Sequence, residues 1–335
     1  MTTSHHHTVR RIAFTSPGQV ELITQDPPDP PQAHQALVQP IRLGICGSDL
    51  HALHGAHPGV PLPVYPGHEA VVRVLAVGDD ADSHLIGRLA LVNPLVTKAD
   101  RDSANTDVNA RVLGFRIPGL GATSAVVDTA QLHLVPPDVD PTAAVMGEPL
   151  AVGVHALRRA GIDDGHVVVI GGGTIGSCLL SALRALTACE VTVVELDEAK
   201  RDFAQSLGAA RTLVNLKDWE SGVVDAVFDC VAGQATLAQA ADTVKDAGQI
   251  IVVGVPRDSR EWILPMPRMQ RYEITMKGTS MYQPRDIDEA LRLIAEGQVD
   301  TKAWVSQTYP LSEVAHAYAA AERPDTMKVV IELDR

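Results

Sequence analysis

The chain has 335 residues, of which 45% are hydrophobic and 21% charged, a composition typical of globular proteins and sufficient for two domains. It carries 28 Lys and Arg against 41 Asp and Glu, and the formal net charge of −13 argues against binding to nucleic acid or to an anionic membrane surface. No apolar run reaches the roughly 18 residues of a membrane-spanning helix, and the first residues lack the apolar core of a secretion signal, so we expect a cytoplasmic protein whose partners are small molecules or copies of itself.

Residues 1–149 consist of short alternating runs rich in Pro, Gly and Val, which predict a β-rich, partly barrel-like domain. Within them, the stretches LGICGSDLHALHGAHPG and PGHEA supply the thiol of Cys46, the imidazole of His68 and the carboxylate of Glu69. Zinc accepts these three ligand types in tetrahedral sites. Asp49 is a candidate to orient the ring of His68, because zinc-bound imidazoles usually donate their second N–H to a carboxylate. The alternatives are a buried apolar cysteine, a hydrogen-bonded core histidine and an exposed loop acid.

The middle of the chain, HVVVIGGGTIGSCLLSALRALTACEVTVVELDEAKRDFAQSLGA, alternates two β-branched runs with two helical patterns and predicts a βαβ unit. Gly171, Gly173 and Gly176 fit G-x-G-x-x-G after a strand and at the opening of a helix, the context in which this motif indicates dinucleotide binding. The first glycine allows a tight turn, the second lets the backbone approach a pyrophosphate, and the third lets helix and strand pack closely. The helix N-terminus attracts the phosphate charge. The alternative is a parallel sheet with a glycine turn and no nucleotide.

The choice between NAD and NADP depends on the end of the second strand of this unit. Glu195 closes that strand about 20 residues beyond the glycine turn, where a carboxylate can take both ribose hydroxyls of an adenosine. A 2′-phosphate would lie against Glu195 and near Asp197, and no Arg directly follows Glu195 to receive it. The sequence therefore favours NAD over NADP.

Two more buried-strand runs, VVDAVFDCVAG and GQIIVVGVP, extend the same sheet, and EITMKGTS is expected to be its last strand. The amphipathic pattern DIDEALRLIAEGQV predicts a helix that ends near Gly297, and MKVVIELD predicts a strand that returns to the first domain. The expected organisation is a nucleotide-binding domain over residues 150–282 and a β-rich domain over residues 1–149 together with residues 283–335.

Seven stretches resemble the zinc-dependent medium-chain alcohol and polyol dehydrogenases, and the resemblance covers nearly the whole chain. In chain order they are GICGSDLH, PGHEAVVRVLAVG, GRLALVNP, GEPLAVGVHAL, VVVIGGGTIG, VVELDEAK and GQIIVVGVP. The resemblance implies an α/β fold in which a Rossmann doubly wound parallel sheet is joined to a β-rich GroES-like catalytic domain. It also implies a zinc ion in the cleft between the two domains and hydride transfer between NAD and a secondary alcohol, with zinc acting as a Lewis acid.

The resemblance assigns metal ligands in the first domain. It implies that Cys46 and His68 bind zinc, and that Glu69 is a ligand in polyol-type members and an outer or exchanging ligand in others. Glu148, within GEPLAVG, resembles a glutamate of sorbitol-type dehydrogenases that binds the metal directly or through a water molecule. Both possibilities for Glu148 remain open.

The resemblance also assigns a proton relay and contacts to the coenzyme. Ser48 and His51 resemble the relay that carries the proton of the substrate hydroxyl to solvent through the nicotinamide ribose. Helix capping is the alternative role for Ser48. Ile175 is expected behind the nicotinamide ring. The other expected coenzyme contacts are Thr174, Lys200, Val253 and Val255.

One stretch departs from many members of the family. Those members hold a second, structural zinc with four closely spaced cysteines in a lobe that corresponds to residues 95–120, and this stretch contains no cysteine. We therefore expect one catalytic zinc per subunit. Glu148 and Asn93 are expected to make the pocket polar, which favours a polyol, cyclitol or sugar-derived substrate. The alternatives are a zinc-free quinone or enoyl reductase of the same fold and a non-catalytic nucleotide-binding protein.

The run ITMKGTSM predicts how copies of the chain assemble. As the last strand of a sheet it presents unpaired N–H and C=O groups that invite pairing with a second copy, and a two-fold symmetric partner satisfies both edges at once. We expect a homodimer as the minimum unit, with a tetramer possible. The alternative is a monomer whose edge is guarded by the charges of Glu273 and Lys277.

Overall fold

The computed structural model describes residues 8–57, 60–99, 103–217, 219, 222–255 and 261–334. By its contacts the chain divides into two compact units: unit 1 comprises Met1–Glu148 and Ile294–Arg335, and unit 2 comprises Pro149–Leu293. The sequence placed the corresponding boundaries after residues 149 and 282. Among the described residues, no helix is long and apolar enough to cross a membrane.

Unit 1 is built on a seven-stranded sheet. Six of its strands follow the order β16-β17-β3-β4-β5-β9, and the seventh, β8, pairs with β3. Two further two-stranded sheets pair β1 with β2 and β6 with β7. Short strands with alternating buried side chains form these sheets, as the sequence predicts. The strands are β1 (Val9–Phe14), β2 (Val20–Gln25), β3 (Gln35–Ile45), β4 (Glu69–Val77), β5 (Leu89–Val92), β6 (Leu95–Val96), β7 (Arg111–Val112), β8 (Ala125–Asp128), β9 (Leu132–Leu134), β16 (Val305–Pro310) and β17 (Lys328–Glu332).

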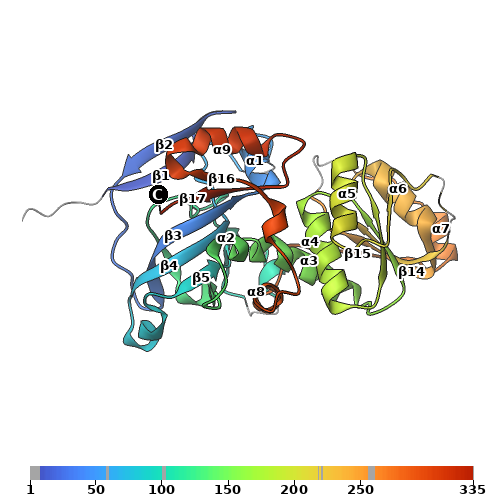
Figure 1. Ribbon diagram of the computed structural model, residues 1–335, viewed down its shortest axis with the longest axis horizontal. Helices are drawn as coiled ribbons and strands as arrows, with labels where there is room; N and C mark the ends of the chain where they lie inside the picture. Colours follow the sequence, from blue (N-terminus) through green and yellow to red (C-terminus); the bar gives the residue numbers. More distant parts are fainter. Residues whose placement is uncertain are drawn as a thin grey trace, which may run out of the picture. The chain divides into compact units, whose positions relative to one another are not determined.

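The last strand of the chain lies inside this sheet, between β16 and β3 (Figure 1). It runs antiparallel to β3, with Val329 opposite Ile45 and Ile331 opposite Leu43. The α-helices of unit 1 are α1 (Gly47–Leu53), α2 (Pro141–Ala144), the start of α3 (Gly147–Ala160), and α9 (Val314–Ala321). Its 3₁₀ turns are η1 (Asp80–Leu85), η2 (Ala104–Thr106), η3 (Thr129–Gln131), η4 (Lys302–Trp304) and η5 (Leu311–Glu313).

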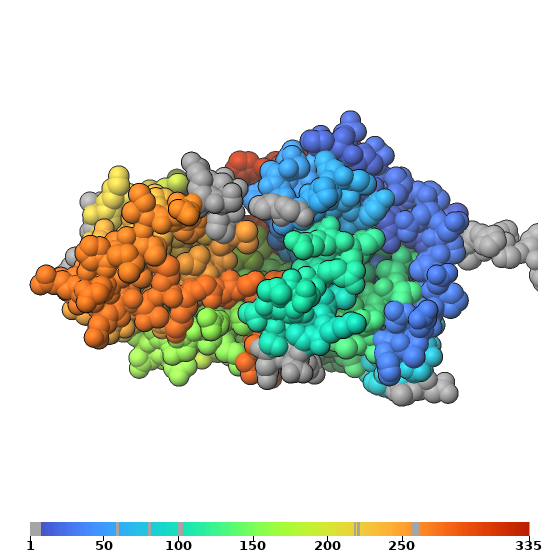
Figure 2. Space-filling view, turned by 180° about the vertical axis from the view of Figure 1, so that it is seen from behind, coloured from blue at the N-terminus to red at the C-terminus, as the bar shows by residue number. Residues whose placement is uncertain are grey.

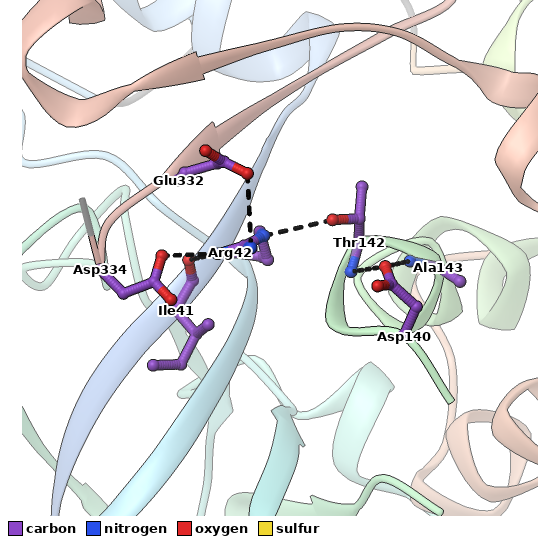
Figure 3. A network of polar contacts seen from close by, with 7 residues as sticks. All are labelled: Ile41, Arg42, Asp140, Thr142, Ala143, Glu332 and Asp334. Carbon is purple, nitrogen blue, oxygen red and sulfur yellow. Dashed lines mark hydrogen bonds and ion pairs between the residues drawn. The ribbon is translucent and has the colours of Figure 1, made fainter. Parts of the chain in front are cut away.

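Arg42 on β3 ties three segments of unit 1 together (Figure 3). Its NH1 group donates to Asp334 Oδ1 at 2.7 Å, and its NH2 group lies 3.4 Å from Glu332 Oε1. On the other side, Arg42 Nε donates to Thr142 Oγ1 in α2 at 3.2 Å. Because α2 is followed closely by α3, these bonds help to fix the segment that carries Glu148.

Unit 2 contains a six-stranded sheet in the order β12-β11-β10-β13-β14-β15, and all neighbouring strands are parallel. The chain winds from β10 first to one edge and then to the other, so the sheet is doubly wound and its switch point lies at β10. The strands are β10 (His166–Ile170), β11 (Glu190–Val194), β12 (Arg211–Leu213), β13 (Val224–Asp229), β14 (Val244–Val252) and β15 (Thr275–Gly278). The helices are the rest of α3, α4 (Thr174–Leu186), α5 (Glu198–Ser206), α6 (Gln234–Thr243), α7 (Met266–Arg271) and most of α8 (Pro284–Ala295).

Strands of unit 2 bury side chains on both faces, which explains their near-continuous runs of Val and Ile. Val167 and Val169 of β10 pack with residues of α3, α4 and α5, whereas Val168 and Ile170 pack with Leu237 of α6. Helices therefore cover both faces of the sheet (Figure 1). The predicted α/β fold, a doubly wound parallel sheet with a separate β-rich domain, is confirmed.

Candidate metal centre and coenzyme site

Three candidate ligands meet where β3 ends and β4 begins. Cys46 directly follows β3, and Glu69 opens β4 opposite Gly44 of β3, so the antiparallel pairing brings the two motifs together. The Sγ of Cys46, a ring nitrogen of His68 and a carboxylate oxygen of Glu69 all lie within 4.8 Å of one another. A Cβ at Gly44 would overlap the Glu69 carboxylate. Glycine at this position therefore leaves the room that the cluster needs.

The charges around His68 favour a cation. His68 Nδ1 lies 3.3 Å from Asp49 Oδ1, an ion-pair distance at which the geometry falls short of a hydrogen bond, and Asp49 Oδ2 accepts a hydrogen bond from Cys46 N at 3.1 Å. Burial alone would lower the pKa of His68, but Asp49 and Cys46 raise it well above its usual value. A positive charge is thus stabilised at this buried imidazole. Thiol, imidazole and carboxylate are donors that zinc binds, so these residues fit a zinc ion.

A buried lysine, Lys328, lies at the same cluster, and no local sequence pattern indicates it. Lys328 Nζ donates to the two carboxylate oxygens of Glu69 at 2.8 and 2.7 Å and to Ile45 O at 3.2 Å. Burial alone would lower the pKa of Lys328, but the negative charges of Glu69, Cys46 and Glu148 raise it, so the ammonium keeps its proton. Both oxygens of Glu69 are therefore engaged by a cation of the chain itself. Glu148 is buried nearby but is not part of the 4.8 Å cluster.

The two residues of the expected relay lie on α1. Ser48 is partly buried and His51 is exposed, and residues three apart in a helix share one face. The N-cap of α1 is Cys46, so Ser48 lies inside the first turn and does not cap the helix. The capping alternative for Ser48 is therefore wrong.

An aromatic side chain from the 95–120 segment packs against the cluster. The ring of Phe115 has its centroid 5.0 Å from that of His68 and 4.7 Å from that of His57, stacked on the latter at 27°. Nothing in the local sequence pattern identified Phe115, because the contact depends on how this segment folds back onto β4.

Asn93, expected to make the pocket polar, uses its side-chain amide oxygen to accept a hydrogen bond from Leu95 N at 3.0 Å.

The expected dinucleotide motif forms the turn between β10 and α4. Gly171 has a φ of +98°, which a residue with a side chain rarely adopts, and its N–H donates to Val194 O at 2.8 Å. A Cβ at Gly176 would overlap Gly171 O, whereas the space beside Gly173, the N-cap of α4, is open. The three glycines thus provide the tight turn, the open approach and the close helix packing that the motif requires.

The other expected coenzyme residues lie at the carboxyl ends of neighbouring strands, the edge at which doubly wound sheets bind ligands. Glu195 follows β11, and its carboxylate accepts from Gly172 N at 2.7 Å and from Asp197 N at 3.0 Å. The carboxylate is therefore held beside the glycine turn. The remaining residues are Thr174 and Ile175 at the start of α4, Lys200 in the first turn of α5, buried Val253 and exposed Val255 after β14.

Two family models match the chain and together span more than half of it. Residues 32–137 match the alcohol dehydrogenase GroES-like domain, and residues 174–296 match the zinc-binding dehydrogenase domain. The first match contains the Cys46, His68 and Glu69 cluster, and the second begins at Thr174, the first residue of α4 after the glycine turn.

Individual proteins are similar over nearly the whole length. The chain is 28% identical over 320 residues to the 2-dehydro-3-deoxy-L-galactonate 5-dehydrogenase of Pseudoalteromonas atlantica, covering 90% of this chain and 92% of that protein. It is 27% identical over 343 residues to the sorbitol dehydrogenase of Halalkalibacterium halodurans, covering 96% and 99%. An alcohol dehydrogenase of Escherichia coli CFT073, solved with NADH, superposes with a TM-score of 0.90 at 22% identity over 97% of this chain and 99% of that one. The fold similarity extends over both units.

Proposed function

The chain belongs to the zinc-dependent medium-chain alcohol and polyol dehydrogenases, and from this premise we propose that it transfers a hydride between NAD and a secondary alcohol or the corresponding ketone. The observation that carries the proposal is the buried cluster of Cys46, His68 and Glu69 in a chain that also has a dinucleotide-type glycine turn. A polyol, cyclitol or sugar-derived compound is the proposed substrate class. The similar proteins named for a galactonate derivative and for sorbitol support this class.

Cys46 and His68 are the proposed zinc ligands. Bound zinc supplies Lewis acidity, which eases the loss of a proton from a substrate hydroxyl. The ion pair between Lys328 and both oxygens of Glu69 supports a role for Glu69 as an outer or exchanging ligand. Direct metal binding would require Glu69 to share its carboxylate with the ammonium of Lys328. Glu148 is proposed to bind the metal directly or through a water molecule.

Ser48 and His51 are the proposed path for the substrate proton. Ser48 Oγ would accept the proton of the substrate hydroxyl as it gives up its own, and the imidazole of His51 would take up a proton at the other end of the path. A bound coenzyme would supply the ribose hydroxyl that links the two residues. Exposure of His51 to solvent supports its role as the last member, because the proton can leave from there. Their shared face of α1, directly after Cys46, supports the order of the path.

NAD is the proposed coenzyme. The Glu195 carboxylate can accept both ribose hydroxyls of an adenosine and repels a 2′-phosphate. NAD should exceed NADP in kcat/KM by at least about tenfold, which corresponds to roughly 1.4 kcal/mol. Equal use of the two coenzymes would contradict the role given to Glu195.

The variant Cys46→Ser tests the zinc assignment, with Cys189→Ser as its matched control because Cys189 is buried in unit 2, outside the cluster. Protein washed with a weak chelator is analysed for zinc, for NADH binding by fluorescence, and for NAD reduction over a panel of polyols, cyclitols, sugars and short alcohols. Wild type and Cys189→Ser should keep one zinc per chain and their turnover. Cys46→Ser should lose both but still bind NADH, because the proposed coenzyme contacts lie in unit 2.

Two experimental results would favour one of the alternative functions over the zinc-dependent dehydrogenase. Activity that survives complete removal of zinc, above all with NADPH and quinones or enoyl substrates, would support the zinc-free reductase. NADH binding without any oxidoreductase activity across the panel would support a non-catalytic nucleotide-binding protein.

A homodimer is the proposed minimum assembly, with a tetramer possible. Among the described strands, β15 ends the parallel sheet, and an edge strand offers unpaired backbone groups to a second copy. Figure 2 shows the segment from α7 to β15, coloured orange, at the surface of unit 2.

A further inference from the structure

Tyr318 on α9 places a hydroxyl in the apolar core of unit 1. Its side chain is 1% exposed, and its ring packs edge-on against Phe14, with the ring centroids 5.1 Å apart and the planes at 89°. Among the residues that the structure describes, this hydroxyl has no hydrogen-bond partner. Buried polar groups of native proteins are nearly always paired, because an unpaired one loses its hydration without compensation. A partner within reach of this hydroxyl is therefore expected.

Helix α9 lies beside α1, the helix that follows Cys46. His54 and Glu322 directly follow α1 and α9, and their side chains pair through Nε2 and Oε1, so the two helices end side by side (Figure 1). Tyr318 lies one turn before Glu322 and shares a buried core with Leu53 of α1. Asp49 lies in the first turn of α1 and is also buried. The phenol and this carboxylate therefore enter the interior of unit 1 from neighbouring helices.

The negative charge of Asp49 acts on this hydroxyl. Burial raises the pKa of Tyr318, and the charges of Asp49, Glu69 and Cys46 raise it further, with Asp49 the largest of the three. The phenol therefore keeps its proton and can donate it in a hydrogen bond. Of the three acidic groups, Asp49 is the one with which it interacts most strongly.

Asp49 has an oxygen that can accept such a bond. Its Oδ2 already accepts from Cys46 N at 3.1 Å, whereas its Oδ1 lies 3.3 Å from His68 Nδ1. This Oδ1, the Nδ1 of His68 and the hydroxyl of Tyr318 are all buried, and none of them forms a hydrogen bond within the described parts of the chain. Internal water molecules occupy polar sites of this kind, where each makes about three hydrogen bonds.

We propose that one internal water molecule joins the hydroxyl of Tyr318 to Oδ1 of Asp49, and that Tyr318 is thereby a positioning residue for the metal centre. The hydroxyl donates to the water, and the water donates to Oδ1. The carboxylate is then held facing His68 Nδ1, which leaves Nε2 of His68 for the metal. Outer partners of this kind orient a ligating imidazole and strengthen metal binding. The inference rests on the proposed function, in which His68 binds zinc.

Four variants of the full-length chain test the bridge: Tyr318→Phe, Asp49→Asn, the double variant, and Tyr309→Phe. Tyr309 in β16 donates to Gln307 Oε1 at 2.6 Å and is not part of the metal cluster, so the last variant controls for the loss of a bonded hydroxyl in unit 1. Competition with a chromogenic chelator measures the dissociation constant of zinc. The visible absorption of cobalt-loaded protein reports the geometry of the ligand set, and urea unfolding of metal-free protein measures stability. None of these readouts depends on turnover.

Tyr318→Phe should weaken zinc binding by about fivefold, and Asp49→Asn by about tenfold or more. The double variant should bind zinc as Asp49→Asn does, within about twofold, because Tyr318 acts only through Asp49. Tyr318→Phe should also shift the cobalt bands in the same direction as Asp49→Asn, and it should unfold at a lower urea concentration than wild type because a paired hydroxyl is lost. Tyr309→Phe should leave the cobalt bands unchanged and the zinc dissociation constant within about twofold of wild type.

Three outcomes would overturn the bridge while leaving the proposed function intact. Native zinc affinity in Tyr318→Phe would show that its hydroxyl does not position the metal centre. Losses of zinc affinity that multiply in the double variant would show that Tyr318 does not act through Asp49. A urea midpoint of Tyr318→Phe equal to or above that of wild type would show that the hydroxyl has no partner in the folded chain. Failure of wild type to bind zinc would instead refute the proposed function.

Discussion

At the candidate metal centre, the ammonium of Lys328 and the carboxylate of Glu69 form a buried ion pair, with Nζ 2.8 and 2.7 Å from the two carboxylate oxygens. Cys46, His68 and Glu69 could be identified from the chain because two short motifs carry them. Lys328 and Phe115 could not, since each reaches the cluster through pairing or packing with a distant segment. Lys328 opens β17, and the register that sets Val329 opposite Ile45 brings its ammonium to Glu69. A strand pattern predicts that residues 328–332 pair with some strand, but not with which strand or in which register.

The variant Lys328→Met should lower the free energy of unfolding by about 3–5 kcal/mol, because it leaves the carboxylate of Glu69 buried without its partner. Urea denaturation of chelator-treated protein measures the change, so that metal cannot replace the missing cation. Lys245→Met is the control: the side chains of Lys245 and Asp225 are 47% and 28% exposed, and a pair of this kind contributes at most about 1 kcal/mol. An equal decrease in the free energy of unfolding in the two variants would contradict the proposal that the buried Lys328–Glu69 pair stabilises the fold more than an exposed pair does.

Among the elements, the βαβ unit follows the sequence most closely. Strand β10, helix α4 and strand β11 occupy the β-branched, helical and β-branched segments around the glycine turn, because local propensity, period and turn chemistry all agree there. Strand β15 is shorter than the predicted run EITMKGTS, since Glu273 has a φ of +52° and so lies outside the β region. Helix α8 was predicted correctly as an amphipathic helix, but the pattern does not tell which neighbour it packs against.

The glycine turn allows a matched pair of substitutions. Gly176→Ala should lower the free energy of unfolding by about 1–3 kcal/mol, because the new methyl group would overlap Gly171 O. Gly173→Ala has open space around the new Cβ and should change stability by less than about 0.5 kcal/mol. It should nevertheless weaken NADH binding by about tenfold or more, since this glycine is proposed to admit the pyrophosphate.

Thermal or urea unfolding and NADH fluorescence separate the two effects. A Gly173→Ala variant with native stability and native NADH affinity would contradict the proposed position of the pyrophosphate. A fully stable Gly176→Ala variant would show that α4 can shift away from the turn at little cost.

Asp286 connects α8 to α3 within unit 2. Its carboxylate accepts from Arg158 Nε at 2.8 Å and from Gln283 N at 2.8 Å, and it lies 2.8 Å from His155 Nδ1. Burial alone would raise the pKa of Asp286, but the hydrogen bonds from His155, Gln283 and Arg158 outweigh it and lower the pKa. A carboxyl whose folded-state pKa is lowered adds stability above its unfolded pKa of about 3.9, and this stability is lost as the pH falls through the folded-state value.

The variant Asp286→Asn should therefore be less stable than wild type by about 1–3 kcal/mol at pH 7. The difference should stay constant down to about pH 5 and shrink below about pH 4. Urea unfolding at a series of pH values measures it. Asp325→Asn is the control, because the ion pair of Asp325 with Arg323 is mostly exposed and should contribute little at any pH. A difference for Asp286→Asn that grows toward acid pH would contradict the assignment.

At the scale of the whole molecule, the sequence predicts the folds of the two units more accurately than the residue at which the chain passes from unit 2 back to unit 1. The sequence placed it after residue 282, whereas the contacts of the chain place it after Leu293. Helix α8 accounts for the difference, because Asp286 bonds to α3 and keeps most of that helix with unit 2. Such a boundary depends on a few polar contacts between helices that are far apart in the sequence, and composition or periodicity cannot report them.

Among the described strands, β15 is one of the two that end the sheet of unit 2, and its outer edge is the one proposed to pair with a second copy. The N–H of Thr279 donates to Val252 O of β14 at 3.1 Å, and since alternate residues of a strand point to opposite sides, the backbone groups of Met276 point to the free edge of β15. Lys277, considered as a charge that guards this edge, instead donates to Gln249 Oε1 at 2.9 Å and to Ala160 O at 3.4 Å. Its ammonium is therefore directed toward α3 and β14, which favours an edge that is open to a second copy.

The variant Met276→Pro should convert the proposed dimer to a monomer, because proline removes the outward N–H of β15 without touching the bonds to β14. Met276→Ala keeps that N–H and should remain a dimer. Sedimentation velocity at micromolar concentration measures both, with near-native circular dichroism as the check that each variant is folded. Wild type that sediments near the chain mass of 35.7 kDa would show that the chain is a monomer. A Met276→Pro variant that stays dimeric would show that the two copies meet through a surface other than β15, since a two-fold strand pairing requires that edge on both copies.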